Sequence, residues 1–288
     1  MKTGHMKATS AVAVALLSIV SQVLIGCGST SPAGNATAPS SAALTGNWNL
    51  LGNRSLQQYP LLSLAIVVDG NQITAQGDSL VLCALGGGGG SVGLSGQIAA
   101  DGTFSLNEAV GDPSSFQWAI TGTAPPPGGS TWTGTYKLTT SPTYSGCTLN
   151  QTAAFTATEL PPFDGTYVGT FFEGPQSSPT ATVAVTINVS QGSGALSEGT
   201  GQAFFPLSAT LTVSGSPCFT SGTSSTILGG SVVKGDSVGM NFNMNDGSQA
   251  VLFGDYASPD ESTLTQVSLG ILNGQCGQTS YSGTLTRQ

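Results

Sequence analysis

Hydrophobic and polar residues alternate with a period of two along most of the chain after residue 44. Every second residue is apolar and β-branched in the stretch 182–189, and apolar residues alternate with glycine and asparagine over 238–245. This period predicts half-buried antiparallel β-strands, because successive side chains of a strand point to opposite faces of its sheet. Hairpin turns between the strands are predicted at Asp69-Gly70, Asp101-Gly102 and Asp246-Gly247, where glycine tolerates a positive φ.

The pattern occurs twice along the chain. Gly46-Asn47-Trp48 corresponds to Gly165-Thr166-Tyr167, Cys83 to Cys218, and Cys147 to Cys276. Pro161-Pro162 lies just before the second copy, where a linker is expected. We therefore expect an all-β protein with two tandem antiparallel β-barrel or β-sandwich repeats, each of roughly seven to nine strands. The predicted domains are 44–160 and 161–288.

The first 43 residues have a different character. An apolar run from Ala11 to Ile25 follows Lys2, His5 and Lys7, and is too short to cross a bilayer comfortably. It therefore predicts a cleaved signal peptide over 1–26. The following stretch, 28–43, is small, polar and interrupted by proline, which predicts a disordered tether between residue 27 and the folded part.

Leu24-Ile25-Gly26-Cys27 at the end of the apolar run resembles the lipobox of bacterial lipoproteins. The resemblance implies that Cys27 carries the lipid, including palmitate, and that the mature chain begins there. The alternative is a plain secretory signal with an incidental cysteine. Gly28 is not the aspartate that in this family implies retention at the inner membrane, so the resemblance implies a cell-envelope location, at the outer membrane rather than the inner one.

The whole chain is similar to uncharacterised bacterial envelope lipoproteins made of tandem β-repeats rich in glycine, serine and threonine, and the lipobox and the paired cysteines carry most of this likeness. Gly46-Asn47-Trp48 also resembles the Gly-x-Trp opening of lipocalin-like barrels. Together these resemblances imply a non-enzymatic surface, scaffold or ligand-binding module whose partners are the membrane, through its lipid, and an unidentified small molecule or glycan.

Composition excludes several other functions. After cleavage, four basic residues face fourteen carboxylates, so the mature chain has a net charge of −10. Nucleic acid is an unfavourable partner for such a chain, because its binding requires clustered lysine and arginine. The single histidine, His5, lies in the signal peptide. The mature chain therefore has no imidazole to act as a catalytic base or to bind zinc, and we expect no enzymatic activity, cofactor or metal.

Four cysteines remain once Cys27 is lipidated. An even number in an exported chain predicts disulfides, although four cysteines permit three pairings. The duplication favours one bond within each copy, Cys83 with Cys147 and Cys218 with Cys276.

Several fragments of catalytic motifs have simpler explanations. Gly89-Gly90-Ser91-Val92-Gly93 matches a nucleophile elbow, and Ser231-Val232-Val233-Lys234 matches S-x-x-K, but both lie in strand-like segments. The stretch 243–247 is rich in calcium-type oxygen ligands and is explained by a strand that runs into a hairpin.

The densest acidic group is Asp255, Asp260 and Glu261, beside Tyr256. It makes a carboxylate-dependent, glycosidase-like hydrolase the alternative function, since such enzymes need two facing carboxylates. Three tryptophans occur only in the first copy, where we expect them in the core rather than on an exposed aromatic platform: Trp48, Trp118 and Trp132.

Overall fold

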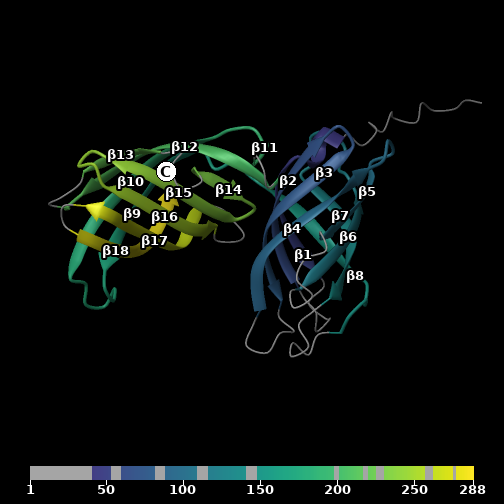
Figure 1. The fold of residues 1–288 in the computed structure, drawn as a ribbon, viewed down its shortest axis with the longest axis horizontal. Helices are drawn as coiled ribbons and strands as arrows, with labels where there is room; N and C mark the ends of the chain where they lie inside the picture. Colours follow the sequence, from purple (N-terminus) through teal and green to yellow (C-terminus); the bar gives the residue numbers. More distant parts are fainter. Residues whose placement is uncertain are drawn as a thin grey trace, which may run out of the picture. The chain divides into compact units, whose positions relative to one another are not determined.

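A computed structural model describes residues 41–52, 60–81, 88–108, 116–140, 148–197, 201–216, 220–224, 230–256, 262–274 and 277–288. Over these residues the protein is built almost entirely from antiparallel strands (Figure 1). Both copies of the repeat fall within one compact unit, Thr37–Gln288. No helix in the described part of the chain has the length and hydrophobicity of a transmembrane segment.

The first copy is a closed barrel of eight strands in sequence order. A short 3-10 turn, η1 (Ser41–Leu44), precedes it. Its strands are β1 (Gly46–Gly52), β2 (Pro60–Asp69), β3 (Gln72–Val81), β4 (Gly88–Ile98), β5 (Thr103–Glu108), β6 (Gln117–Thr123), β7 (Thr131–Thr140) and β8 (Ala153–Leu160). The barrel closes because β1 pairs with β2 on one edge and with β8 on the other.

The second copy closes in the same way. Its strands are β9 (Gly165–Glu173), β10 (Ala181–Gln191), β11 (Ala195–Leu196), β12 (Ala203–Ser214), β13 (Ser221–Ser224), β14 (Val232–Lys234), β15 (Ser237–Met244), β16 (Gln249–Tyr256), β17 (Thr263–Gly274) and β18 (Gly277–Arg287). β9 pairs with β10 and β18, and β10 pairs with β12. β13 and β14 follow one another between β12 and β15, so together they take the place that β4 has in the first barrel.

The structure confirms the all-β class and the tandem repeat, and it selects barrels over sandwiches. Strands β1, β2 and β3 correspond to β9, β10 and β12, while β5 to β8 correspond to β15 to β18. The first strand of each copy pairs with the last, which leaves no open edge. Hydrophobic period alone does not distinguish these architectures, because strands in both bury one face.

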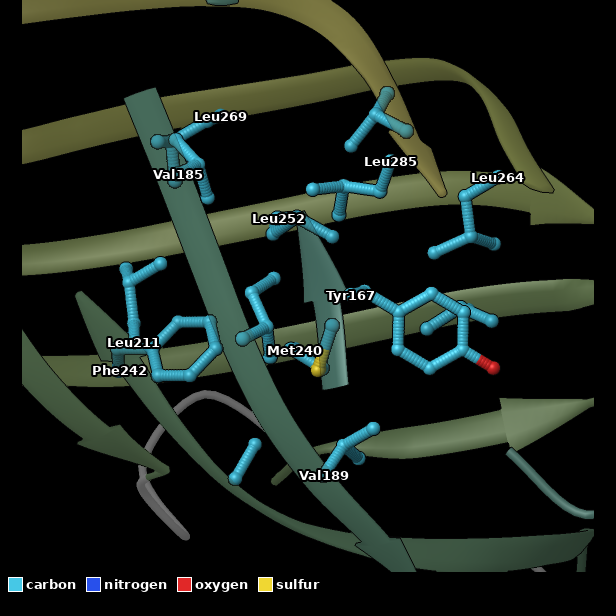
Figure 2. Packing of buried hydrophobic residues seen from close by; sticks show 14 of the residues in the cluster. Tyr167, Val185, Val189, Leu211, Met240, Phe242, Leu252, Leu264, Leu269 and Leu285 are labelled. Carbon is cyan, nitrogen blue, oxygen red and sulfur yellow. The ribbon is translucent and has the colours of Figure 1, made fainter. Parts of the chain in front are cut away.

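The alternation of side chains explains the interior of the second barrel. Val183, Val185, Ile187 and Val189 of β10 are all buried, as are the apolar residues of β15, while Asn243 is exposed. Figure 2 shows Leu252, Leu264, Leu269 and Leu285 from three further strands meeting Tyr167, Met240 and Phe242 in this core. The predicted hairpins are also confirmed, with positive φ at Gly70, Gly102 and Gly247.

Candidate functional site

The predicted lipidation site and disulfide cysteines all lie outside the described residues: Cys27, Cys83, Cys147, Cys218 and Cys276. The pairing of Cys83 with Cys147 and of Cys218 with Cys276 stays a prediction.

The three tryptophans are core residues, as expected. Trp48, Trp118 and Trp132 are 0%, 3% and 3% exposed. Trp132 is the centre of an edge-to-face cluster, with its ring centroid 5.0 Å from those of Phe104 and Phe155 and 5.9 Å from that of Trp48. The Trp48 indole N–H donates to the Leu44 carbonyl at 2.9 Å, so η1 closes one end of the barrel. These rings are packed and do not form a surface platform.

The motif fragments have structural roles. Ser91 lies inside β4, where its Oγ accepts a hydrogen bond from Gln76 Nε2 at 2.8 Å, away from any strand-to-helix turn. Ser231 is buried, and its Oγ accepts the Asn241 backbone N–H at 3.0 Å. Lys234 Nζ donates to Gln202 Oε1 at 3.5 Å. Neither serine therefore has the setting of a nucleophile.

The calcium-like stretch is a hairpin. Asp246 Oδ1 accepts the Ser248 backbone N–H at 3.0 Å and the Ser248 hydroxyl at 2.5 Å. Asn245 Oδ1 accepts the backbone N–H groups of Thr220 and Ser221. Asp246 Oδ1 and Asn245 Oδ1 are thus occupied by hydrogen bonds from the protein, while Asp246 Oδ2 accepts none from the described residues. Among the described residues, no group of three or more histidines, cysteines or acids is arranged to hold a metal ion.

Of the predicted acidic group, Asp260 and Glu261 lie outside the described residues, and Asp255 is exposed at the end of β16. Among the described residues, the carboxylates near Asp255 are Asp236, in the turn between β14 and β15, and Asp78 of β3. Neither neighbour was expected from the sequence, because Asp78 belongs to the first barrel and Asp255 and Asp236 belong to the second. In the sequence, Asp78 and Asp236 each stand out only as a single acidic residue at or near a predicted strand.

This carboxylate group lies where the two barrels meet. The turn that contains Gly235 and Asp236 rests on the outer face of β1 and β2. Gly235 N–H donates to Asn47 Oδ1 at 2.9 Å, and Asp236 N–H donates to Ser63 Oγ at 2.7 Å. Asn47 and Ser63 point outward from the first barrel and are nevertheless buried by this contact, at 3% and 2% exposed.

Burial at this junction changes the acidity of two carboxyl groups. The pKa of Asp236 is raised mainly by burial, with a smaller contribution from the Asp255 and Asp78 carboxylates, while a hydrogen bond from Ser63 opposes the shift. The pKa of Asp78, an exposed residue overall, is raised by partial desolvation and then by Asp255, and Lys234 opposes this. A carboxyl group with a raised pKa close to other carboxyl groups is an arrangement that general acid–base catalysis uses.

A second polar group lies inside the first barrel, at the end where β5 stops and β6 starts. Glu108 continues the inward row of Phe104 and Leu106, and burial raises its pKa to about 7 although the Trp118 backbone N–H donates to its carboxyl. Glu108 was not expected from the sequence to be a buried acid. The sequence did contain one indication. Glu108 lies two residues after Leu106, so it occupies an inward position of β5 at which the alternation predicts an apolar residue.

The outer surface carries shallow hollows. One of about 590 Å³ lies over β9, β17 and β18, among the hydroxyls of Thr170, Ser268, Ser282 and Thr284. Another, of about 530 Å³, lies over β1, β7 and β8 and is lined in part by Gly52, Gly134 and Phe155. Neither contains an acid or a cation.

No family model matches the chain, and no curated protein matches it. Among solved structures, it is similar to a protein of unknown function of the DUF3598 family from Nostoc punctiforme PCC 73102, with 12% identity and a TM-score of 0.23 over 85% of this chain and 97% of that chain. It is also similar to kievitone hydratase from Nectria haematococca, with 9% identity and a TM-score of 0.25 over 88% of this chain and 95% of that chain. Likenesses of this size bear on neither the fold nor the activity.

Proposed function

We propose that this protein is a lipid-anchored lipoprotein of the bacterial cell envelope whose two barrels act by binding or scaffolding and catalyse no reaction. The observation that carries the proposal is the filling of both barrels. Each is packed with buried aromatic and aliphatic side chains, among them Trp48, Trp132, Tyr167 and Phe242. Such interiors make rigid modules.

Charge and sequence support the same proposal. The lipobox at Cys27 supplies the anchor, and the mature net charge of −10 disfavours nucleic acid as a partner. Gly28 favours the outer membrane, as above. The absence of histidine after Cys27 removes the usual base for a serine or thiol nucleophile.

Replacement of the anchoring residue tests the first half of this proposal. Cys27→Ser removes the thiol that the lipid is attached to, so the protein should move from the membrane fraction to the soluble envelope fraction, with an intact mass lower by the lipid. Fractionation and mass spectrometry measure both. Thr30→Ala, three residues further along the predicted tether, is the control and should stay with the membrane. A Cys27→Ser protein with unchanged location and mass would show that the anchor lies elsewhere.

The carboxylates at the junction favour one second candidate, a hydrolase. Asp236 combines a raised pKa with the neighbouring carboxylates of Asp78 and Asp255, which makes it the residue to act as a general acid. Against this candidate, Asp236 is held by Ser63 in a contact between the barrels, where it also contributes to packing.

A turnover screen distinguishes the two candidates. The purified protein is offered glycan, ester and peptide panels, and the proposed function predicts turnover no faster than in buffer. Turnover that is lost in both Asp236→Asn and Asp255→Asn, and kept in Asp69→Asn of the β2–β3 hairpin, would establish the hydrolase in its place. Circular dichroism of each variant controls for unfolding.

A further inference from the structure

The hollow of about 590 Å³ on the outer face of the second barrel is lined by neutral residues only, over the part of the chain that the structure describes. Ser268 of β17 pairs with Ser282 of β18, and both side chains point outward and are exposed. Because these two side chains are short, the surface between β9 and β16 is hollowed. Gln176 in the β9–β10 turn also lines the hollow.

Two aromatic residues stand on either side of the serines. In the register of the sheet, Ser282 pairs with Phe172 of β9, and Ser268 pairs with Phe253 of β16. Phe253 is 59% exposed, more than any other large hydrophobic residue in the described ranges. A Cβ at Gly239 of β15 would lie 3.4 Å from its ring, so the ring rests where β15 has no side chain. One row on the outer face therefore holds a ring, two hydroxyls and a second ring, over roughly 14 Å of sheet.

A β-bulge in β17 adds an amide to the hollow. Leu264 pairs with Leu285, and three residues further along β17, Val267 pairs with Gly283, only two residues before Leu285. The extra residue of β17 lets Gln266 point outward into the hollow while Val267 stays buried. Gln266 has a φ of 52°, a conformation that is uncommon for residues other than glycine and asparagine. Strain of this kind is concentrated at functional sites.

The first barrel lacks these features at the equivalent place, over β1, β7 and β8. In the corresponding row Thr121 has the position of Phe253, and Thr135 has that of Ser268. The hydroxyls of Thr121 and Thr135 are hydrogen-bonded to each other at 2.9 Å. β7 pairs with β8 in an unbroken register, so no residue is inserted there. The same strands thus close without the exposed ring or the bulge, and the fold does not require either.

We propose that the hollow of the second barrel binds a neutral oligosaccharide. The rings of Phe172 and Phe253 offer apolar surfaces to the C–H faces of sugar rings, and the amide of Gln266 and the serine hydroxyls supply donors and acceptors for sugar hydroxyls. An acidic sugar is disfavoured, because the described lining holds no cation and the mature chain has a net charge of −10. The inference rests on the binding form of the proposed function and names the chemistry of its ligand.

Three neutral trisaccharides serve as probes, namely maltotriose, cellotriose and N,N′,N″-triacetylchitotriose, with trigalacturonic acid as the charged comparison. The readout is the side-chain amide signal of Gln266 in the ¹⁵N-labelled protein, assigned by its disappearance in Gln266→Ala. The protein is kept in a zwitterionic detergent that contains no sugar. At least one neutral probe should shift the signal in a saturable way. No saturable shift with any neutral probe, or equal affinity for trigalacturonic acid, would overturn the proposal.

Calorimetric titration of variants locates the binding surface. Phe172→Ala removes a ring and Ser282→Leu fills the hollow, so each should weaken binding at least about tenfold. Leu51→Ala, in the hollow of the first barrel, is the control and should bind as the parent does. Circular dichroism checks that each variant is folded. Parental affinity in both Phe172→Ala and Ser282→Leu, or an equal loss in Leu51→Ala, would overturn the proposal.

Gln266→Gly separates binding from structure at the bulge. Glycine adopts the positive φ without strain, so this variant should unfold at no lower urea concentration than the parent and still bind at least about tenfold more weakly. Parental affinity in Gln266→Gly would overturn the assignment of its amide to the site. None of these outcomes affects the membrane location of Cys27→Ser or the turnover screen, so the proposed function is tested separately.

Discussion

Glu108 makes the clearest single-residue contribution to the pH dependence of stability. Burial raises its pKa from 4.5 to about 7, so between these values the folded protein holds a proton that the unfolded chain releases. The contribution of Glu108 to the free energy of unfolding is therefore highest below about pH 4.5. This contribution falls as the pH rises from about 4.5 to about 7, and it is constant at higher pH.

Glu108→Gln should remove this dependence. The amide is neutral at every pH, so the variant should unfold with a free energy about 1 kcal/mol higher than the parent at pH 8 and equal to it at pH 4. The expected gain is discounted from the full pKa shift because the side chain is partly exposed. Urea denaturation at both pH values measures it, with Asp69→Asn in an exposed turn as the control. A gain of equal size at pH 4 would contradict the titration of Glu108.

At the scale of the strand, close contact across β4 and β5 requires glycine. A Cβ built on Gly96 meets the backbone oxygen of Ser105 in β5, whereas a Cβ on Gly90 of the same strand meets nothing within 4 Å. The backbone oxygen of Ser105 cannot relieve this overlap by rotating away, as the end of a flexible side chain can. Gly96→Ala should therefore force β4 and β5 apart and lower the free energy of unfolding by about 1–3 kcal/mol.

Gly90→Ala is the matched control on β4, and its effect should be within about 0.5 kcal/mol. Denaturation in urea at pH 7 measures both variants. Equal effects of the two substitutions would show that loss of glycine flexibility, rather than the contact with Ser105, determines the stability of this pair of strands.

At the scale of the whole molecule, the two barrels share a buried contact. Outward-facing residues of β1 to β3 are buried there, including Ala65, which belongs to the same hydrophobic cluster as the core of the second barrel. Gly235 has a φ of 62°, and a Cβ at this position meets the backbone of Ser63 at 2.4–2.6 Å. The turn of the second barrel thus fits closely against the first, and unfolding of the barrels should be coupled.

Asn47→Ala tests this coupling. The substitution leaves the buried Gly235 N–H without its acceptor, at a cost of about 1–3 kcal/mol that falls on the contact between the barrels. Calorimetry should show the single unfolding transition of the parent dividing into two. Asn107→Ala, at an exposed position of β5, should keep one transition. A single transition in Asn47→Ala, merely shifted to lower temperature, would mean that other contacts couple the barrels.

The sequence by itself determined the local features of this protein. The alternation over 238–245 predicts which residues of β15 are buried, because strand geometry sends successive side chains to opposite faces. Asp-Gly pairs predict the hairpins, as Gly70 and Gly102 show, since only a few residues decide a tight turn. The repeat also follows from sequence, because the second copy keeps the same order of strands and turns. Each of these depends on neighbours in the chain.

Tertiary structure decided whatever depends on distant pairing. Closure of the barrels rests on β1 with β8 and β9 with β18, and both barrels and sandwiches satisfy the same alternation. Asp255 was predicted to act with Asp260 and Glu261, yet its described acidic neighbours are Asp78 and Asp236, because the contact between the barrels brings them together. For Glu108, the sequence determines one part of its setting and the tertiary structure determines another. Its inward phase is visible in the sequence, whereas its place opposite Trp118 is set by the register of β5 on β6.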